Sequence, residues 1–73
     1  MGKMRKYAVV FEKAPQNWAA YVPDLPGCIA TGRTLEETRR LIAEAIEFYI
    51  EGMRRHGEAV PEPTARAEEI EVV

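Results

Sequence analysis

The sequence predicts a small α+β domain with the element order β-β-β-α-β, and three observations carry this prediction. Residues 6–22 contain two short runs rich in β-branched and aromatic side chains, which is typical of strands. Residues 35–56 place apolar side chains at helical spacing. Pro61 and Pro63 prevent any further helix there, and residues 68–73 return to a strand-like pattern. The prediction is a three-stranded antiparallel meander, one long helix packed on the sheet, and a final strand.

The first strand is expected over residues 6–13. Because successive side chains of a strand point to opposite faces, Tyr7, Val9 and Phe11 should share one face. The other face also carries apolar groups, so we expect this strand to be central in the sheet and covered on both sides. Residues 14–17 contain the proline and asparagine of a turn, which makes the first connection a hairpin.

The second strand is expected over residues 18–22 and ends at a proline. The stretch 23–27 contains two prolines and a glycine, so it should be a stiff turn in which the glycine adopts positive φ. Asp24 is expected to bond the downstream backbone of its own turn. A short third strand over residues 28–31 then pairs beside the second strand.

The helix has the clearest local signal in the chain. Thr34 and Glu37 fit a capping box, in which the Thr34 hydroxyl accepts from the Glu37 amide and the Glu37 side chain returns to the Thr34 amide. The helix is expected over residues 35–56, with Gly57 as its C-terminal stop and Gly52 as a weak point inside it. Its apolar stripe comprises Leu35, Thr38, Leu41, Ile42, Ala45, Ile46, Tyr49 and Met53.

The last part of the chain should return across the sheet. Residues 58–64 read as an extended connection, and residues 68–73 as a fourth strand. The right-handed crossover rule places that strand parallel to the first, giving the sheet order 3-2-1-4. The helix then covers one face of the sheet, while the other face keeps apolar groups in contact with water, as interaction surfaces do.

Size and charge narrow the function classes. With 73 residues, a net charge of −2 and one cysteine, the chain reads as one domain that has no internal disulfide and offers no basic field for nucleic acid. Small domains often gain stability by association, so we expect a homo-oligomer, a dimer or a tetramer. We expect no direct nucleic-acid contact, no signal peptide, no membrane span and a cytoplasmic location. The candidate interface residues, for a partner or for another copy, are Tyr7, Val9, Phe11, Trp18, Tyr21, Phe48 and Ile50.

The chemistry-bearing residues do not assemble into a catalytic set. Cys28 has no histidine near it in sequence, so it is expected to be a buried small hydrophobe. His56 falls at the helix end, where a cation is favourable. Glu12, Asp24 and Glu37 are too few and too peripheral for the inward acidic ligands of a metal-dependent nuclease. The sequence therefore predicts no catalytic, cofactor-binding or metal-binding residues, no cofactor, and a protein that is not an enzyme.

Four motifs in order resemble one family. They are P-D-L-P-G-C at 23–28, T-L-E-E at 34–37, A-I-E-F-Y-I-E-G-M at 45–53 and G-E-A-V-P-E-P at 57–63. Together they resemble the HicB-like antitoxins, and the likeness runs from Tyr7 to about residue 63. The resemblance implies a partial ribonuclease-H-like fold, an oligomer, and an antitoxin that binds and sterically neutralises a HicA-like, mRNA-cleaving toxin.

The resemblance also sets the alternatives. Longer relatives add a DNA-binding module, whereas residues 1–73 read as a single HicB-like antitoxin domain, so we expect no DNA-binding domain, and the sequence leaves a role in autoregulation open. Because such a toxin should be basic, acidic side chains could steer the encounter. These candidates are Glu44, Glu47, Glu51, Glu68, Glu69 and Glu71. The alternative functions are an orphan structural or oligomeric domain without a toxin partner, a small-ligand binder that uses Tyr7, Trp18 and Tyr21, and a residual nuclease.

Overall fold

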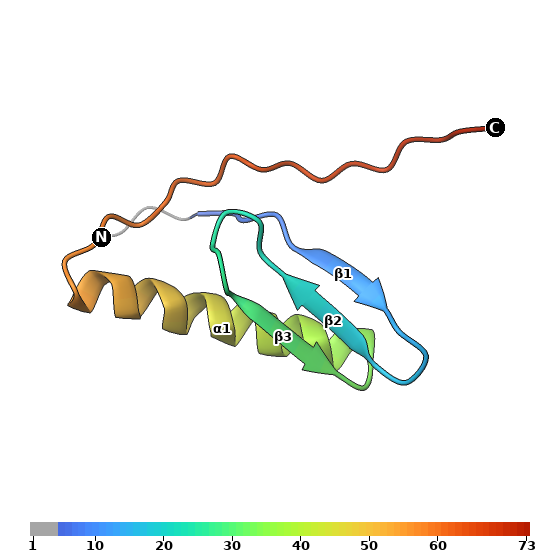
Figure 1. Cartoon of the computed structure of the whole chain (residues 1–73), viewed down its shortest axis with the longest axis horizontal. Coiled ribbons are helices and arrows are strands. Elements are labelled where there is room, and N and C mark those ends of the chain that lie inside the picture. Colours follow the sequence, from blue (N-terminus) through green and yellow to red (C-terminus); the bar gives the residue numbers. More distant parts are fainter. Residues whose placement is uncertain (1–4) are drawn as a thin grey trace.

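One helix lies against one face of a three-stranded antiparallel sheet (Figure 1). The computed structural model describes residues 5–73. Its elements are β1 (Val10–Lys13), β2 (Trp18–Tyr21), β3 (Ile29–Gly32) and α1 (Leu35–Arg55). The α+β class, the antiparallel meander and the single long helix are therefore confirmed. The first two strands are shorter than expected, because residues 6–9 and Val22 lie outside the ladder, and the third strand lies one residue later than the expected 28–31.

The strand register sorts the side chains between the two faces. Directly opposite residues across the sheet share a face. The row that faces α1 consists of Phe11, Ala20 and Ala30, and the neighbouring row on the uncovered face consists of Val10, Tyr21 and Ile29. The row on the uncovered face is apolar, and each of its three side chains is at least partly exposed to water. No other element covers this face within residues 5–73, as the sequence predicts.

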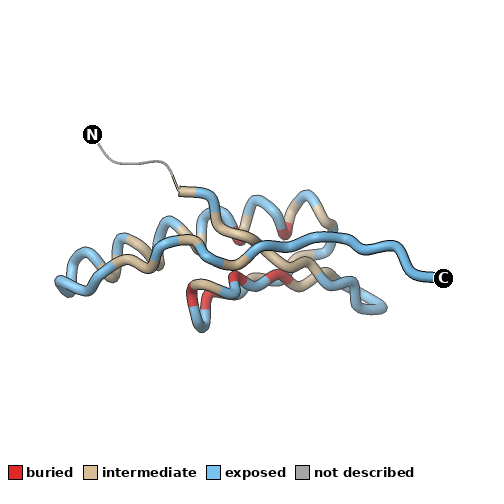
Figure 2. Tube along the Cα trace, turned by 90° about the horizontal axis from the view of Figure 1, so that it is seen from above, coloured by how far each residue is buried: buried red, intermediate tan, exposed pale blue. Residues whose placement is uncertain are grey.

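The buried core is small and lies between α1 and the sheet. Its apolar members are Ala20, Val22, Leu25, Cys28 and Ile42. Figure 2 shows that these positions gather at the turn that follows β2 and along the inner side of the helix. Leu25 is fully buried at 0 % exposure, so the turn supplies part of the core as well as the connection.

Two successive β-turns build that connection. The Leu25 amide donates to the Val22 carbonyl, and the Cys28 amide donates to the Leu25 carbonyl, each at 3.0 Å. The Val22 amide donates to the Cys28 carbonyl at 3.2 Å. The proline at 26 and Gly27 occupy the centre of the second turn, and Gly27 has φ of +83°, as a type II turn requires. The positive φ expected for this glycine is thereby confirmed.

The helix start follows the expected capping box with one difference. Thr34 is the N-cap, and its hydroxyl accepts from the Glu37 amide at 3.0 Å. The Glu37 carboxylate, however, accepts from the Arg33 amide at 2.7 Å instead of the Thr34 amide. The side chain therefore reaches one residue further back than predicted, and it fixes the entry of the chain from β3 into α1.

The helix end is a Schellman arrangement. The helix ends at Arg55, one residue earlier than predicted, and His56 is its C-cap. Gly57 has φ of +69° and donates to the Arg54 carbonyl at 3.1 Å. The Glu58 amide donates to the Met53 carbonyl at 2.9 Å. Gly57 is thus the stop that the sequence indicates.

Asp24 anchors the segment that follows the helix. One carboxylate oxygen accepts from the amides of Thr64 and Ala65, each at 3.0 Å, and the other accepts from the Thr64 hydroxyl at 2.8 Å. The Ala65 amide is the main reason that the pKa of Asp24 lies below its ordinary value, and the Thr64 hydroxyl adds to it. The prediction that Asp24 serves its own turn was wrong, because its partners lie 40 and 41 residues away.

The fourth strand is not formed within residues 5–73, so the order is β1-β2-β3 and β1 is an edge strand, not the predicted central one. The tail, defined as residues 58–73, runs in the same direction as β1 on the far side of it and then diverges (Figure 1). Successive strand amides point to opposite sides, so one of the Thr64 and Ala65 amides would have to donate to β1. Asp24 takes both.

Candidate protein-binding surface

The outward side of α1 carries one acidic and aromatic surface. Glu44, Glu47, Phe48 and Glu51 follow the spacing that places helical residues on one face. They line a shallow hollow of about 260 Å³. Phe48 is 79 % exposed, so an aromatic ring projects into water among three carboxylates. We call this set the acidic–aromatic surface; its composition suits a basic protein partner.

A second, apolar groove lies beside the free edge of β3. Its volume is about 340 Å³, and its lining residues are Gly27, Cys28, Ile29, Ala45, Phe48, Tyr49 and Gly52. No charged side chain lines it, and Ile29 at its rim is 67 % exposed. We call it the β3 groove. Phe48 separates it from the acidic–aromatic surface.

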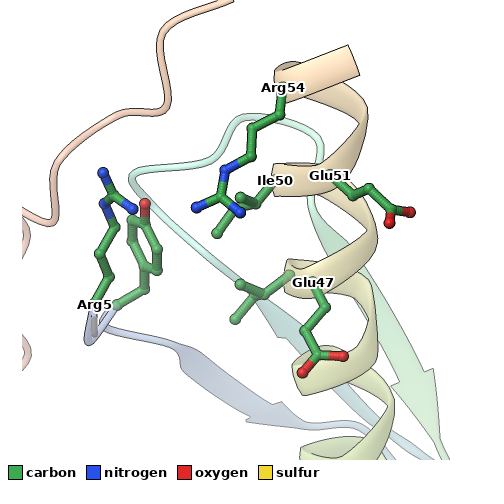
Figure 3. A pocket seen from close by; sticks show the side chains of 7 residues that line it. Arg5, Glu47, Ile50, Glu51 and Arg54 are labelled. Carbon is green, nitrogen blue, oxygen red and sulfur yellow. The ribbon is translucent and has the colours of Figure 1, made fainter. Parts of the chain in front are cut away.

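A third groove, of about 460 Å³, lies at the other edge of the sheet, between residues 5–7 and α1. Its lining residues are Arg5, Tyr7, Ile46, Glu47, Ile50, Glu51 and Arg54. Figure 3 shows Arg5 and Arg54 reaching toward each other from opposite walls, whereas Glu51 points away. Arg5 pairs with Glu62 of the tail at 3.4 Å, and the Tyr7 hydroxyl donates to the Pro61 carbonyl at 2.5 Å. Charges therefore ring this groove, unlike the β3 groove.

The structure does not bring the seven predicted interface residues together on one surface. Tyr7, Val9 and Phe11 pack against the core beneath α1, and Trp18 lies half-buried on the same sheet face. Tyr21 is on the uncovered face, where 41 % of it is exposed. The helical members separate as well, with Phe48 outward and Ile50 in the charged groove. The trio Tyr7, Trp18 and Tyr21 is likewise split between the two faces of the sheet.

The chemistry-bearing residues lie far apart. Cys28 is buried at 4 % exposure, and burial raises the pKa of its thiol above the ordinary value, as predicted for a small core residue. His56 caps the helix end, with its Nδ1 2.7 Å from the Gly52 carbonyl oxygen. Within residues 5–73, no three His, Cys, Asp or Glu side chains are grouped as a metal site needs. In the same range no helix has the length and apolarity to cross a membrane.

Two features escaped the sequence reasoning. The sequence predicted that Asp24 bonds the backbone of its own turn, so its contact with the tail was missed. Nothing in the sequence indicated the β3 groove. The glycines at 27 and 52 both line the groove, and an added Cβ at either position would meet nothing within 4 Å. Two lining glycines 25 positions apart in a turn and a helix leave no signal in sequence spacing.

Comparison with known proteins now places the chain. Residues 7–72 match the family described as the HicB-like antitoxin of bacterial toxin–antitoxin systems. The chain belongs to the HicB-like antitoxin family. The predicted resemblance is thereby confirmed, and the match extends past the last motif that carried it, at 57–63, to residue 72.

The relatives of this chain differ in length. The chain is 32 % identical to Antitoxin HicB 2 of Photorhabdus laumondii, with 93 % of this chain and 49 % of that protein covered. It is 41 % identical to a UPF0150 protein of Thermoplasma acidophilum, with 92 % and 96 % covered. An uncharacterized 14.9 kDa protein of Haemophilus phage HP1 is 42 % identical, with 75 % and 41 % covered. The chain thus spans about half or less of two of these relatives and nearly all of the third.

Proposed function

We propose that this protein is an antitoxin that binds a HicA-like, mRNA-cleaving toxin and neutralises it by steric occlusion. The observation that carries the proposal is the family match over residues 7–72. A relative named as an antitoxin aligns with 93 % of this chain and 49 % of its own length, which supports the proposal for the half of that protein that this chain matches. The proposal gives the protein a protein-binding role instead of a catalytic one, and places it in the cytoplasm, where the toxin would meet mRNA.

The acidic–aromatic surface is the proposed contact for the toxin. An RNA-cleaving toxin needs a basic face, and carboxylates at Glu44, Glu47 and Glu51 would attract that face from a distance. Phe48 offers the desolvated aromatic anchor on which protein interfaces concentrate their binding energy. Occupying the RNA-binding face of the toxin would exclude substrate without any chemical step.

Co-expression with a HicA-like toxin from a neighbouring reading frame tests the proposal. Cells that make the toxin alone should stop growing, and cells that also make this protein should grow and yield a complex that survives purification. Growth arrest that persists with the protein present in folded, abundant form would overturn the proposed function. If the protein is instead an orphan domain without a toxin partner, growth arrest should persist and no complex should form.

Charge reversal tests the contact surface separately. Glu47→Lys with Glu51→Lys should lower the association rate at low salt by about tenfold, because steering charges raise on-rates by roughly 10–1,000-fold. The matched control is Glu12→Lys with Glu58→Lys, which changes the net charge equally at exposed positions elsewhere. If both pairs of substitutions lower the association rate equally, or if neither pair lowers it, this surface is not the contact for the toxin. Phe48→Ala should instead raise the dissociation rate.

A further inference from the structure

The end of the tail is a strand-forming segment that lacks a strand partner. Residues 66–73 are all exposed; Ile70 and Val72 are 79 % and 87 % exposed, and Val73 is fully exposed. Ile70 and Val72 alternate with Glu71, as in a half-buried strand. A segment of this kind normally buries its apolar side against a sheet, and large apolar exposure marks an interaction surface.

Residues 68–73 cannot pair with β1 of the same chain, because the register of the tail places them beyond the end of that strand. The contact between Tyr7 and Pro61 starts the two segments side by side, and they run in the same direction (Figure 1). Counted from that contact, residues 64–67 would lie opposite Val10–Lys13. Ile70 would then lie about 10 Å beyond the end of β1, at ~3.3 Å per residue. The Asp24 anchor holds the tail at this position.

Its own β3 does not pair with it either. The tail runs beyond β1, and the free edge of β3 is on the opposite side of the sheet (Figure 1). Among residues 5–73, β3 pairs with β2 alone, and residues 66–73 belong to no strand ladder. A second molecule can supply the partner strand that the tail lacks.

We propose that residues 68–73 of one copy add as a strand to the free edge of β3 in a second copy, and that the exchange is reciprocal. Edge strands present unpaired amides and carbonyls that accept an added strand. Ile70 and Val72 then occupy the β3 groove, which is lined without charged side chains. Glu69 and Glu71 face the open side of the sheet, in contact with water.

The β3 edge is favoured over the β1 edge by the chemistry of the two grooves. Beside β1, the same two apolar side chains would meet a groove lined by Arg5, Glu47, Glu51 and Arg54, whose desolvation is costly. The anchored residues 61–65 also occupy the approach to that edge. The closed result is a two-fold symmetric dimer in which each copy donates one tail and accepts one.

Light scattering of the full chain tests the exchange. The wild type should have twice the 8.3 kDa chain mass at micromolar concentration, and Ile70→Glu with Val72→Glu should have the single mass. The matched control, Ala59→Glu with Ala67→Glu, adds the same charge at exposed tail positions and should remain a dimer. Circular dichroism should show all three folded, since none of these residues is buried. A monomeric wild type, or a dimer that survives the first pair of substitutions, overturns the proposal.

Cross-linking identifies the edge that accepts the tail. A chain with Thr31→Cys is mixed with a differently tagged chain with Glu71→Cys and oxidised mildly, while the native Cys28 stays buried. Both new thiols would lie on the open side of the extended sheet, and a disulfide between the two tagged chains is expected. The control replaces Thr31→Cys by Glu12→Cys, an exposed position of β1 on the same face. Preferential cross-linking of the Glu12→Cys chain would overturn the assignment to β3.

Discussion

At the scale of single residues, two side chains in one turn join distant parts of the chain. Asp24 holds Thr64 and Ala65 of the tail, while Leu25 fills the core at 0 % exposure. The two β-turns aim these neighbouring side chains in opposite directions, one toward the tail and one toward α1. This short Pro-rich stretch therefore fixes both the helix-to-sheet packing and the path of the tail.

Removing the carboxylate of Asp24 should release the tail. Asp24→Ala removes the oxygen that accepts from both the Thr64 and Ala65 amides and leaves no acceptor in its place. Amide hydrogen exchange at these two residues should become fast, while exchange in the core of α1 stays slow. Glu62→Gln is the control, because an exposed ion pair contributes little. Unchanged protection at residues 64 and 65 would contradict the anchor.

The same anchor should depend on pH. Because the native pKa of Asp24 lies below its ordinary value, the anchor is fully present above the unfolded-state pKa of about 3.9. It should be lost as the pH falls through the lower native pKa. Acid titration followed by NMR should show the Thr64 and Ala65 signals shifting with the Asp24 carboxyl. Shifts that occur at neutral pH instead would argue against this assignment.

Truncating Leu25 should be severe. Leu25→Ala empties a site without solvent contact, and such changes cost about 2–5 kcal/mol, a large part of the roughly 5–15 kcal/mol that stabilises a typical domain. In a urea titration, the midpoint concentration should fall by the amount that corresponds to this loss in the free energy of unfolding. Ile29→Ala, at a side chain that is 67 % exposed, should change the midpoint far less. Similar losses at both positions would mean that the turn does not contribute to the core.

At the scale of elements, the helix is defined at both ends and weak in its last turns. The close approach of β3 to its first turn depends on Gly32, where an added Cβ would lie 2.6 Å from the Thr38 hydroxyl oxygen. Thr38 itself is fully buried and donates to the Thr34 carbonyl at 2.8 Å. Thr38 therefore lies on the buried side of the helix, as predicted, and its hydroxyl group has a hydrogen-bond partner at the start of the same helix. Gly52, in contrast, lies where nothing surrounds a potential Cβ.

Two glycine substitutions in and after the helix should have opposite signs. Gly52→Ala should stabilise the protein by about 1 kcal/mol, the propensity difference inside a helix, which corresponds to about 4–8 °C in Tm for a domain of this size. Gly57→Ala should lower Tm, because its φ of +69° disfavours a side chain. Thermal unfolding of both variants checks the pair. A fall in Tm for Gly52→Ala would mean that its space is needed.

At the scale of the whole molecule, the chain is too extended for one compact unit. Its radius of gyration is 13.7 Å, whereas a compact domain of this length has about 11 Å. The long helix and the projecting tail account for the difference. Among residues 5–73, five apolar residues form the buried core, so a single copy has little to stabilise it, and the strand exchange proposed above would bury the apolar end of the tail.

Association should therefore appear in thermal stability. If folding and tail exchange are coupled, Tm of the wild type should rise with protein concentration, because mass action stabilises the associated state. The Ile70→Glu, Val72→Glu variant should show a Tm independent of concentration. Calorimetric scans over a hundredfold concentration range make the comparison. A wild-type Tm that does not move would contradict the coupling.

The sequence by itself determined the local structure. The Thr34 cap, the Gly57 stop and the positive φ of Gly27 each depend on residues within a few positions, where backbone sterics and short hydrogen-bonded rings decide the conformation. The class, the antiparallel meander, the long helix and the family could thus be predicted. The burial of Cys28 was also predicted, because a cysteine without a neighbouring histidine normally behaves as a small core residue.

Only the tertiary structure decided which distant groups meet. Asp24 can satisfy its own turn or a tail 40 residues away at similar local cost, and packing selects the tail. That choice occupies the amides that a fourth strand needs, and it leaves residues 68–73 beyond the end of β1. Strand propensity is local, whereas strand pairing requires a partner in register, so the pattern in residues 68–73 could predict a strand but not its partner.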